Sequence, residues 1–112
     1  MDVDSSVVST RQVDVVPLHG TVRATAVTVG TTATALPATP LSGRYAVSIV
    51  NNSTSTVYLG GSDVTAASGY ALYKYDSMDI DLDDETIIYA IVSAGTADVR
   101  VLEVSSYALG AE

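Results

Sequence analysis

Residues 41–104 read LSGRYAVSIVNNSTSTVYLGGSDVTAASGYALYKYDSMDIDLDDETIIYAIVSAGTADVRVLEV, and this stretch decides the fold class. Short runs rich in valine, isoleucine, threonine and tyrosine are separated by turn-forming pairs such as Asn-Asn, Gly-Gly, Ser-Gly and Asp-Asp. Short strands with turn signals at close intervals are typical of an antiparallel β-sandwich. The sequence therefore predicts an all-β, jelly-roll-like antiparallel β-sandwich of eight or nine short strands with no significant helix.

The run from Arg44 to Val50 is an alternating strand near the start of this stretch. One predicted face carries Tyr45, Val47 and Ile49. The other predicted face carries Arg44, Ala46 and Ser48. Asn51-Asn52-Ser53 then supplies turn residues, because asparagine tolerates positive φ and bonds to nearby backbone. We therefore expect Thr56–Leu59 to return antiparallel and to form a hairpin with this strand.

Residues 78–83 alternate strictly between apolar side chains and aspartates. A strand with this period places Met78, Ile80 and Leu82 inward, where we expect them to be buried. It places Asp79, Asp81 and Asp83 outward, as a solvated acidic face that deters pairing between sheet edges. The next run, TIIYAIVS at residues 86–93, is the most hydrophobic of the chain and is the predicted central strand. We expect most of residues 87–92 to be buried.

The chain before residue 41 divides into two parts. Thr21–Leu36 is rich in threonine and valine and predicts two strands that separate at Gly30 and end before Pro37. Residues 1–20 mix valines with aspartates and serines, which fits either a frayed terminus or an arm that adds a strand to a neighbour. The candidate contacts of such an arm are Val7, Val8, Val13 and Val15. We therefore divide the chain into an N-terminal arm or peripheral strand at 1–20 and a single β-sandwich domain at 21–112.

Composition limits the size and the kind of core. The 112 residues suffice for one domain. Because the chain has no Trp, Phe or Cys, aliphatic residues and some of the seven Tyr must fill the interior. A thin core without disulfides is commonly supplemented by oligomerisation, so we expect a homo-oligomer.

Charge and hydropathy disfavour several classes of partner. The net charge of −8 opposes binding to a phosphate backbone, so nucleic acid is not an expected partner. No stretch approaches the roughly 18–20 apolar residues of a membrane span, so no membrane contact is expected. The N-terminal run MDVDSSVVSTRQ has neither the basic nor the apolar region of a signal peptide, and we expect synthesis in a cytoplasm.

The side chains do not form a recognisable catalytic or metal-binding motif. His19 is the only histidine and lies between Leu18 and Gly20, in a turn-like segment unsuited to orient a catalytic base. Six carboxylates fall within residues 76–85, but alternate positions on a strand lie about 6–7 Å apart, too far to share an ion. The turn at 83–85 is the best remaining candidate for a cation. We expect no catalytic residue, no metal site and no cofactor.

Three tyrosines gather around one loop, at Tyr70, Tyr73 and Tyr75. A structural role is the ordinary expectation, because a tyrosine ring can cover the edge of a core while its hydroxyl reaches water. Tyrosine on a loop is also common in protein interfaces and binding loops. We take these three residues as a second candidate interface beside the arm valines.

Several runs resemble small β-sandwich proteins encoded by tailed bacteriophages. The matching runs are Leu41–Arg44, Val57–Thr65, Tyr89-Ala90, Ala94–Val101 and the lead-in Val27–Leu36, with Gly69 and Leu72 between them. The likeness covers roughly residues 22–104. In similar sequences the loop before the acidic strand often reads like Pro-Gly with an acidic residue, whereas this chain has Tyr73-Lys74-Tyr75-Asp76-Ser77.

The resemblance implies a virion component of the head decoration, cement or head-fibre type. Such a protein would be made in the host cytoplasm and located on the capsid surface. Its expected partner is the major capsid protein of the same virion, and its expected state is a homo-oligomer, with a trimer slightly favoured. The alternative is a carbohydrate- or receptor-binding module of a tail fibre or adhesin, which would use the tyrosine loop.

Overall fold

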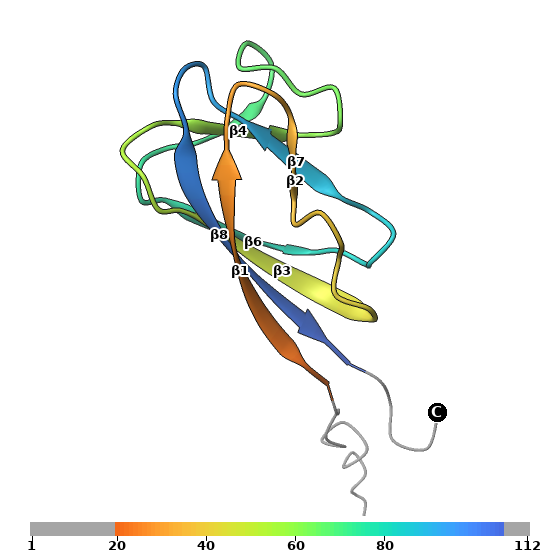
Figure 1. The fold of residues 1–112 in the computed structure, drawn as a ribbon. Helices are drawn as coiled ribbons and strands as arrows, with labels where there is room; N and C mark the ends of the chain where they lie inside the picture. The colour runs from red at the N-terminus through yellow and green to blue at the C-terminus, as the bar shows by residue number, and fades with distance from the viewer. Residues whose placement is uncertain (1–19, 107–112) are drawn as a thin grey trace, which may run out of the picture.

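Two four-stranded antiparallel sheets make up the structure, a computed structural model that describes residues 20–106 (Figure 1). In chain order the strands are β1 Val22–Val29, β2 Thr34–Leu36, β3 Arg44–Asn51, β4 Val57–Gly60, β5 Tyr70–Leu72, β6 Ser77–Asp81, β7 Ile88–Ile91 and β8 Ala97–Ser105. The predicted all-β class is confirmed. No helix in the described part of the chain is long and apolar enough to cross a membrane.

The strand order identifies the sandwich as a jelly roll. One sheet has the order β1-β8-β3-β6 and the other has the order β2-β7-β4-β5. The pairs β1–β8, β2–β7, β3–β6 and β4–β5 are those of one antiparallel ribbon that doubles back between β4 and β5. Rolling that ribbon into two layers adds the pairs β3–β8 and β4–β7. The jelly-roll-like prediction is therefore confirmed at the level of strand order.

The core between the sheets is aliphatic. Its members are Val29, Leu36, Val47, Ile49, Val57, Leu59, Leu72, Ala90, Val92, Ala97, Val99 and Val101. None of these is aromatic: the expected aliphatic core is present, but the prediction that some of the seven tyrosines would help to fill it is wrong for this core. Each fully buried valine, leucine or isoleucine side chain contributes roughly 1.5–3 kcal/mol of transfer free energy, so many small contributions replace a few large ones.

The first two strands follow the predicted pattern. β1 ends at Val29 and β2 begins at Thr34, so the break falls at Gly30 as expected. Residues 37–43 connect β2 to β3, and Pro37 and Pro40 lie in this connection because proline cannot donate to a strand ladder.

A β-bulge at the start of β3 overturns part of the predicted face assignment. The register shifts between Arg44 and Ala46. Val47 and Ile49 face the core as predicted, but Arg44 is buried and Tyr45 is 48% exposed. A bulge inserts one extra residue into the strand and so reverses the side-chain alternation beyond it. Arg44 therefore points inward and Tyr45 outward, opposite to the prediction.

The predicted hairpin between residues 44–50 and 56–59 is wrong. β3 pairs with β6 and β8, whereas β4 pairs with β5 and β7 in the other sheet. Residues 52–56 therefore carry the chain from one layer to the other. Both sides of β3 are already paired, which leaves no edge for β4 to join.

The expected alternation of β6 is confirmed, but full burial is not. Met78, Ile80 and Leu82 pack against the core and are only half-buried, while Asp79 and Asp81 are exposed. β7 is an internal strand as predicted, although within residues 87–92 only Ala90 and Val92 are fully buried. Burial is incomplete because β6 is an edge strand at the open flank of the sandwich.

Candidate binding surface

An apolar groove of about 380 Å³ opens where the inner face of β6 meets the opposite sheet. Its apolar lining includes Leu59, Tyr70, Met78, Ile80, Leu82 and Ile88. Residues 73–76 connect β5 directly to β6, so these two edge strands lie on the same flank of the sandwich. Because β5 has only three residues, it leaves the inward side chains of β6 partly uncovered. The groove exists because the two layers do not close over each other here.

Carboxylates alternate with and follow the groove-lining residues of β6 along the chain, although none of them lines the groove itself. Asp79 and Asp81 project from the outer face of β6, and Asp83, Asp84 and Glu85 lie in the turn that follows. The hydroxyl of Ser48 donates to Asp79 Oδ1 at 2.6 Å. The resulting surface combines an apolar floor with an acidic rim.

The turn after β6 uses its carboxylates to hold backbone. Asp83 Oδ1 accepts the backbone N–H groups of Glu85 and Thr86, both at 3.0 Å, and these bonds hold the pKa of Asp83 below its ordinary value. Asp84 Oδ2 accepts the N–H of Gly43 at 2.7 Å. Within residues 20–106, no group of three or more carboxylate or histidine side chains is placed to hold a metal ion. These bonds give Asp83 and Asp84 a structural role in the turn.

The tyrosine loop is a tight turn despite its large side chains. The N–H of Asp76 donates to the carbonyl of Tyr73 at 3.0 Å, which closes a four-residue turn. Tyr75 occupies the third position with φ of 60°. A turn with positive φ at this position favours glycine there and proline before it. This chain forms the turn with a tyrosine in the strained position.

Asn51 at the end of β3 holds this turn from inside. Its side chain is fully buried, and Nδ2 donates to the carbonyls of Ser55, Leu72 and Tyr73 at 2.6, 3.0 and 3.2 Å. Its backbone N–H donates to the Asp76 carbonyl at 2.9 Å. The predicted role of Asn51 in local backbone bonding is confirmed, but it acts as a buried anchor and not through positive φ.

The structure separates the three predicted interface tyrosines into two places. Tyr70 lies on β5 and lines the apolar groove. Tyr73 and Tyr75 lie in the following turn, each 61% exposed, and neither lines the groove. The four arm valines and His19 lie outside the described residues, so their predicted roles stay predictions.

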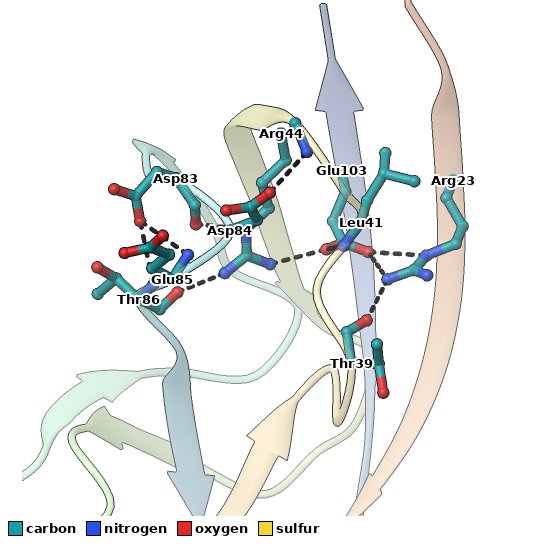
Figure 2. A network of polar contacts seen from close by, with 10 residues as sticks. Arg23, Thr39, Leu41, Arg44, Asp83, Asp84, Glu85, Thr86 and Glu103 are labelled. Atoms are coloured by element: carbon teal, nitrogen blue, oxygen red, sulfur yellow. Dashed lines mark hydrogen bonds and ion pairs between the residues drawn. The ribbon is translucent and has the colours of Figure 1, made fainter.

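A buried ionic network, which was not expected, braces one end of the sandwich (Figure 2). Glu103 on β8 is 0% exposed and accepts hydrogen bonds on both carboxylate oxygens. Oε1 receives Arg23 Nε of β1 at 2.9 Å, and Oε2 receives Arg44 Nη1 of β3 at 2.7 Å. The N–H of Leu41 also donates to Oε2, at 2.8 Å. One carboxylate thus joins three adjacent strands and the connector before β3.

Arg44 extends the network to the turn that carries the acidic rim (Figure 2). Its Nε donates to the Asp83 carbonyl at 2.8 Å, and its Nη2 donates to the Thr86 carbonyl. Burial alone would raise the pKa of Glu103, but the Leu41 N–H and the two guanidinium groups outweigh it and hold that pKa below its ordinary value. Because Glu103 and Arg44 pair with each other, both charges lie inside the protein, whereas the Arg23 side chain is 37% exposed.

The sequence contained a signal for the inward direction of the Glu103 side chain but none for that of Arg44. Glu103 shares the inward parity of Val99 and Val101 along β8, so simple alternation places it inside. Arg44 has the outward parity of Ala46 and Ser48, and only the bulge turns it inward.

No protein-family model matches the chain, and a search of curated proteins gave no match.

Proposed function

We propose that this chain is a non-enzymatic structural protein of a tailed-phage virion that binds the outside of the capsid and stabilises it. The observation that carries the proposal is the apolar groove beside β6, with its acidic rim. Exposed apolar surface bordered by polar residues is typical of protein–protein contact sites. The resemblance of residues 22–104 to phage β-sandwich proteins supplies the class of partner, which is the major capsid protein of the same virion.

In a decoration protein, the groove and the arm would supply the contacts that stabilise the assembled shell. A protein that binds only the assembled shell stabilises it over free subunits by mass action. Residues 1–20 would add contacts by pairing with a neighbouring sheet edge, and ordering them would cost roughly 1–2 kcal/mol per residue of backbone entropy. Such an arm suits a partner that holds it in place only after assembly.

Co-sedimentation with assembled shells tests the proposal. The purified full-length chain is mixed with capsids of the phage that encodes it, and separately with unassembled capsid protein. We expect saturable binding to shells alone and a higher temperature of shell disruption when the chain is bound. Failure to bind assembled shells at micromolar concentration would overturn the proposal.

Two variants locate the attachment surface on the chain. Deletion of residues 2–16 should weaken shell binding and leave the sandwich folded, whereas Tyr73→Ala with Tyr75→Ala should have the smaller effect. The reverse ranking would assign attachment to the tyrosine turn. Native mass spectrometry of the same samples measures the oligomeric state, for which we expect a homo-oligomer, with a trimer slightly favoured.

A carbohydrate- or receptor-binding module of a tail fibre is the second candidate. The exposure of Tyr73 and Tyr75 favours it, because exposed tyrosine rings supply contact area at small entropic cost. A glycan array with the wild-type chain and the double alanine variant tests this function. Selective glycan binding that the variant loses would support the tail-fibre module over the decoration protein.

A further inference from the structure

The free edge of β6 and the groove beside it form one surface with a definite pattern. We propose that this surface accepts an extended segment of a partner protein in which apolar and basic side chains alternate. The segment would add a fifth strand to the β1-β8-β3-β6 sheet. The inference rests on the proposed function in taking a protein as the target, and it specifies the chemistry of the bound segment.

Among the described residues 20–106, no strand pairs with the outer side of β6, so its backbone has hydrogen-bonding groups available there. The N–H of Leu82 donates to the Tyr45 carbonyl of β3, and the N–H of Asn51 on β3 donates to the Asp76 carbonyl. Even-numbered residues of β6 therefore turn their N–H and C=O groups toward β3. Asp79 and Asp81 turn theirs toward the free edge, where an added strand would find donors and acceptors in register.

Side-chain alternation specifies what the added strand should carry. A residue opposite Ile80 would point its side chain inward, over the apolar groove that Ile80 and Met78 line. Residues opposite Asp79 and Asp81 would point outward, beside the two carboxylates. Apolar side chains at one parity and basic side chains at the other therefore match the surface.

Charge favours a basic partner segment over the N-terminal residues of this chain. Residues 79–85 carry five carboxylates, and Arg44, the buried cation nearest to them, is bonded to Glu103. The N-terminal run alternates Val13, Asp14 and Val15, which would set a carboxylate opposite the aspartates of β6. Like charges directly opposite each other in a sheet are destabilising.

Binding of a synthetic peptide to the full-length chain tests the inference. The probe is a blocked heptapeptide in which lysine alternates with valine, followed by fluorescence anisotropy at low salt. A matched peptide with glutamate in place of lysine should bind at least about tenfold more weakly, because it repels the acidic rim. A third peptide of unchanged composition, with its lysines grouped at one end, should also bind more weakly because it lacks the alternation.

Charge variants of the chain provide a second test of the inference. Asp79→Asn with Asp81→Asn should weaken lysine-peptide binding about two- to thirtyfold, the range expected for two cross-strand ion pairs. The control Asp98→Asn alters an exposed aspartate on β8, two strands away from β6, and should leave binding unchanged. Equal weakening by both variants would overturn the inference, because it would indicate a non-specific charge effect.

Hydrogen exchange locates the peptide on the edge. The N–H groups of Asp79 and Asp81 should exchange fast in the free chain and slowly in the complex, while that of Ile80 is protected in both by β3. Binding without protection of Asp79 and Asp81 would overturn the inference. So would a gain in peptide affinity after deletion of residues 2–16, which would identify the arm as the occupant.

Shell sedimentation keeps the two proposals distinguishable. If the chain binds shells but does not bind the lysine–valine peptide, the β6 inference is overturned and the decoration proposal stands. Peptide binding without shell binding would overturn decoration and leave the β6 inference standing.

Discussion

The end of the sandwich around Glu103 buries charged side chains, whereas the flank beside β6 exposes apolar ones. At the Glu103 end, the Glu103 carboxylate and the Arg44 guanidinium lie fully buried, and each carboxylate oxygen and each guanidinium nitrogen has a hydrogen-bond partner. At the β6 flank, Met78, Ile80 and Leu82 remain half-exposed because the facing strand is too short to cover them. The buried charges therefore lie in the part of the molecule whose polar groups find their partners within the chain. Exposed apolar surface marks the part that a partner would complete.

The largest expected effect comes from removing the Glu103 carboxylate from the buried network at the end of the sandwich around Glu103, which we call the closed end. Glu103→Ala should lower the free energy of unfolding by about 3–5 kcal/mol, because it leaves Arg44 buried without its counter-ion. Urea unfolding followed by circular dichroism measures this loss. Asp98→Ala, which removes the exposed partner of Arg100, is the control and should have a much smaller effect. Similar losses for the two variants would show that the closed end does not depend on the network.

The next effect compares a core isoleucine with a groove isoleucine. Ile49→Ala should cost about 2–5 kcal/mol, since Ile49 is 0% exposed and its removal leaves a cavity. Ile80→Ala should cost clearly less, because the Ile80 side chain already borders an open groove. The measurement is again urea unfolding of both variants. Equal costs would mean that the flank is closed in solution, by oligomerisation or by another segment.

Acid should weaken the closed end more than the open flank. Because the pKa of Glu103 is lowered in the folded state, its contribution is present above the unfolded pKa of about 4.3 and is lost as pH falls through the folded pKa. The difference in unfolding free energy between wild type and Glu103→Gln should therefore shrink as the pH falls below about 4. Urea titrations from pH 7 to pH 3 measure this difference. A difference that stays constant over this range would contradict the assigned pKa direction.

The smallest effect concerns the tyrosine turn. Tyr75→Gly should stabilise the chain by up to about 1 kcal/mol, because positive φ strains the tyrosine backbone whereas glycine adopts it readily. Tyr75→Ala is the matched control, since it removes the ring and keeps the strain, and it should bring no gain. Thermal unfolding of both variants measures the change. Equal stability of the glycine and alanine variants would show that the turn is not strained.

Local pattern was sufficient for much of the fold. Strict alternation over residues 78–83 predicted which side chains of β6 face inward, and the break at Gly30 predicted the separation of β1 from β2. The first prediction succeeded because side chains alternate between the two faces of a regular strand, and the second because glycine interrupts a strand pattern. The aliphatic core followed from composition, since no Trp or Phe was available to fill it.

Only the tertiary structure decided which strands are neighbours and where the layers stay open. The alternation of Thr56–Leu59 shows one buried face but contains no information about the partner, so the predicted hairpin failed. The inward turn of Arg44 required a bulge, and the half-burial of Ile80 required the shortness of β5 on the same flank. Pairing and coverage are set by segments far apart in the chain. The sequence by itself therefore determined the class of fold and the direction of most side chains, whereas three-dimensional packing determined the buried network and the groove.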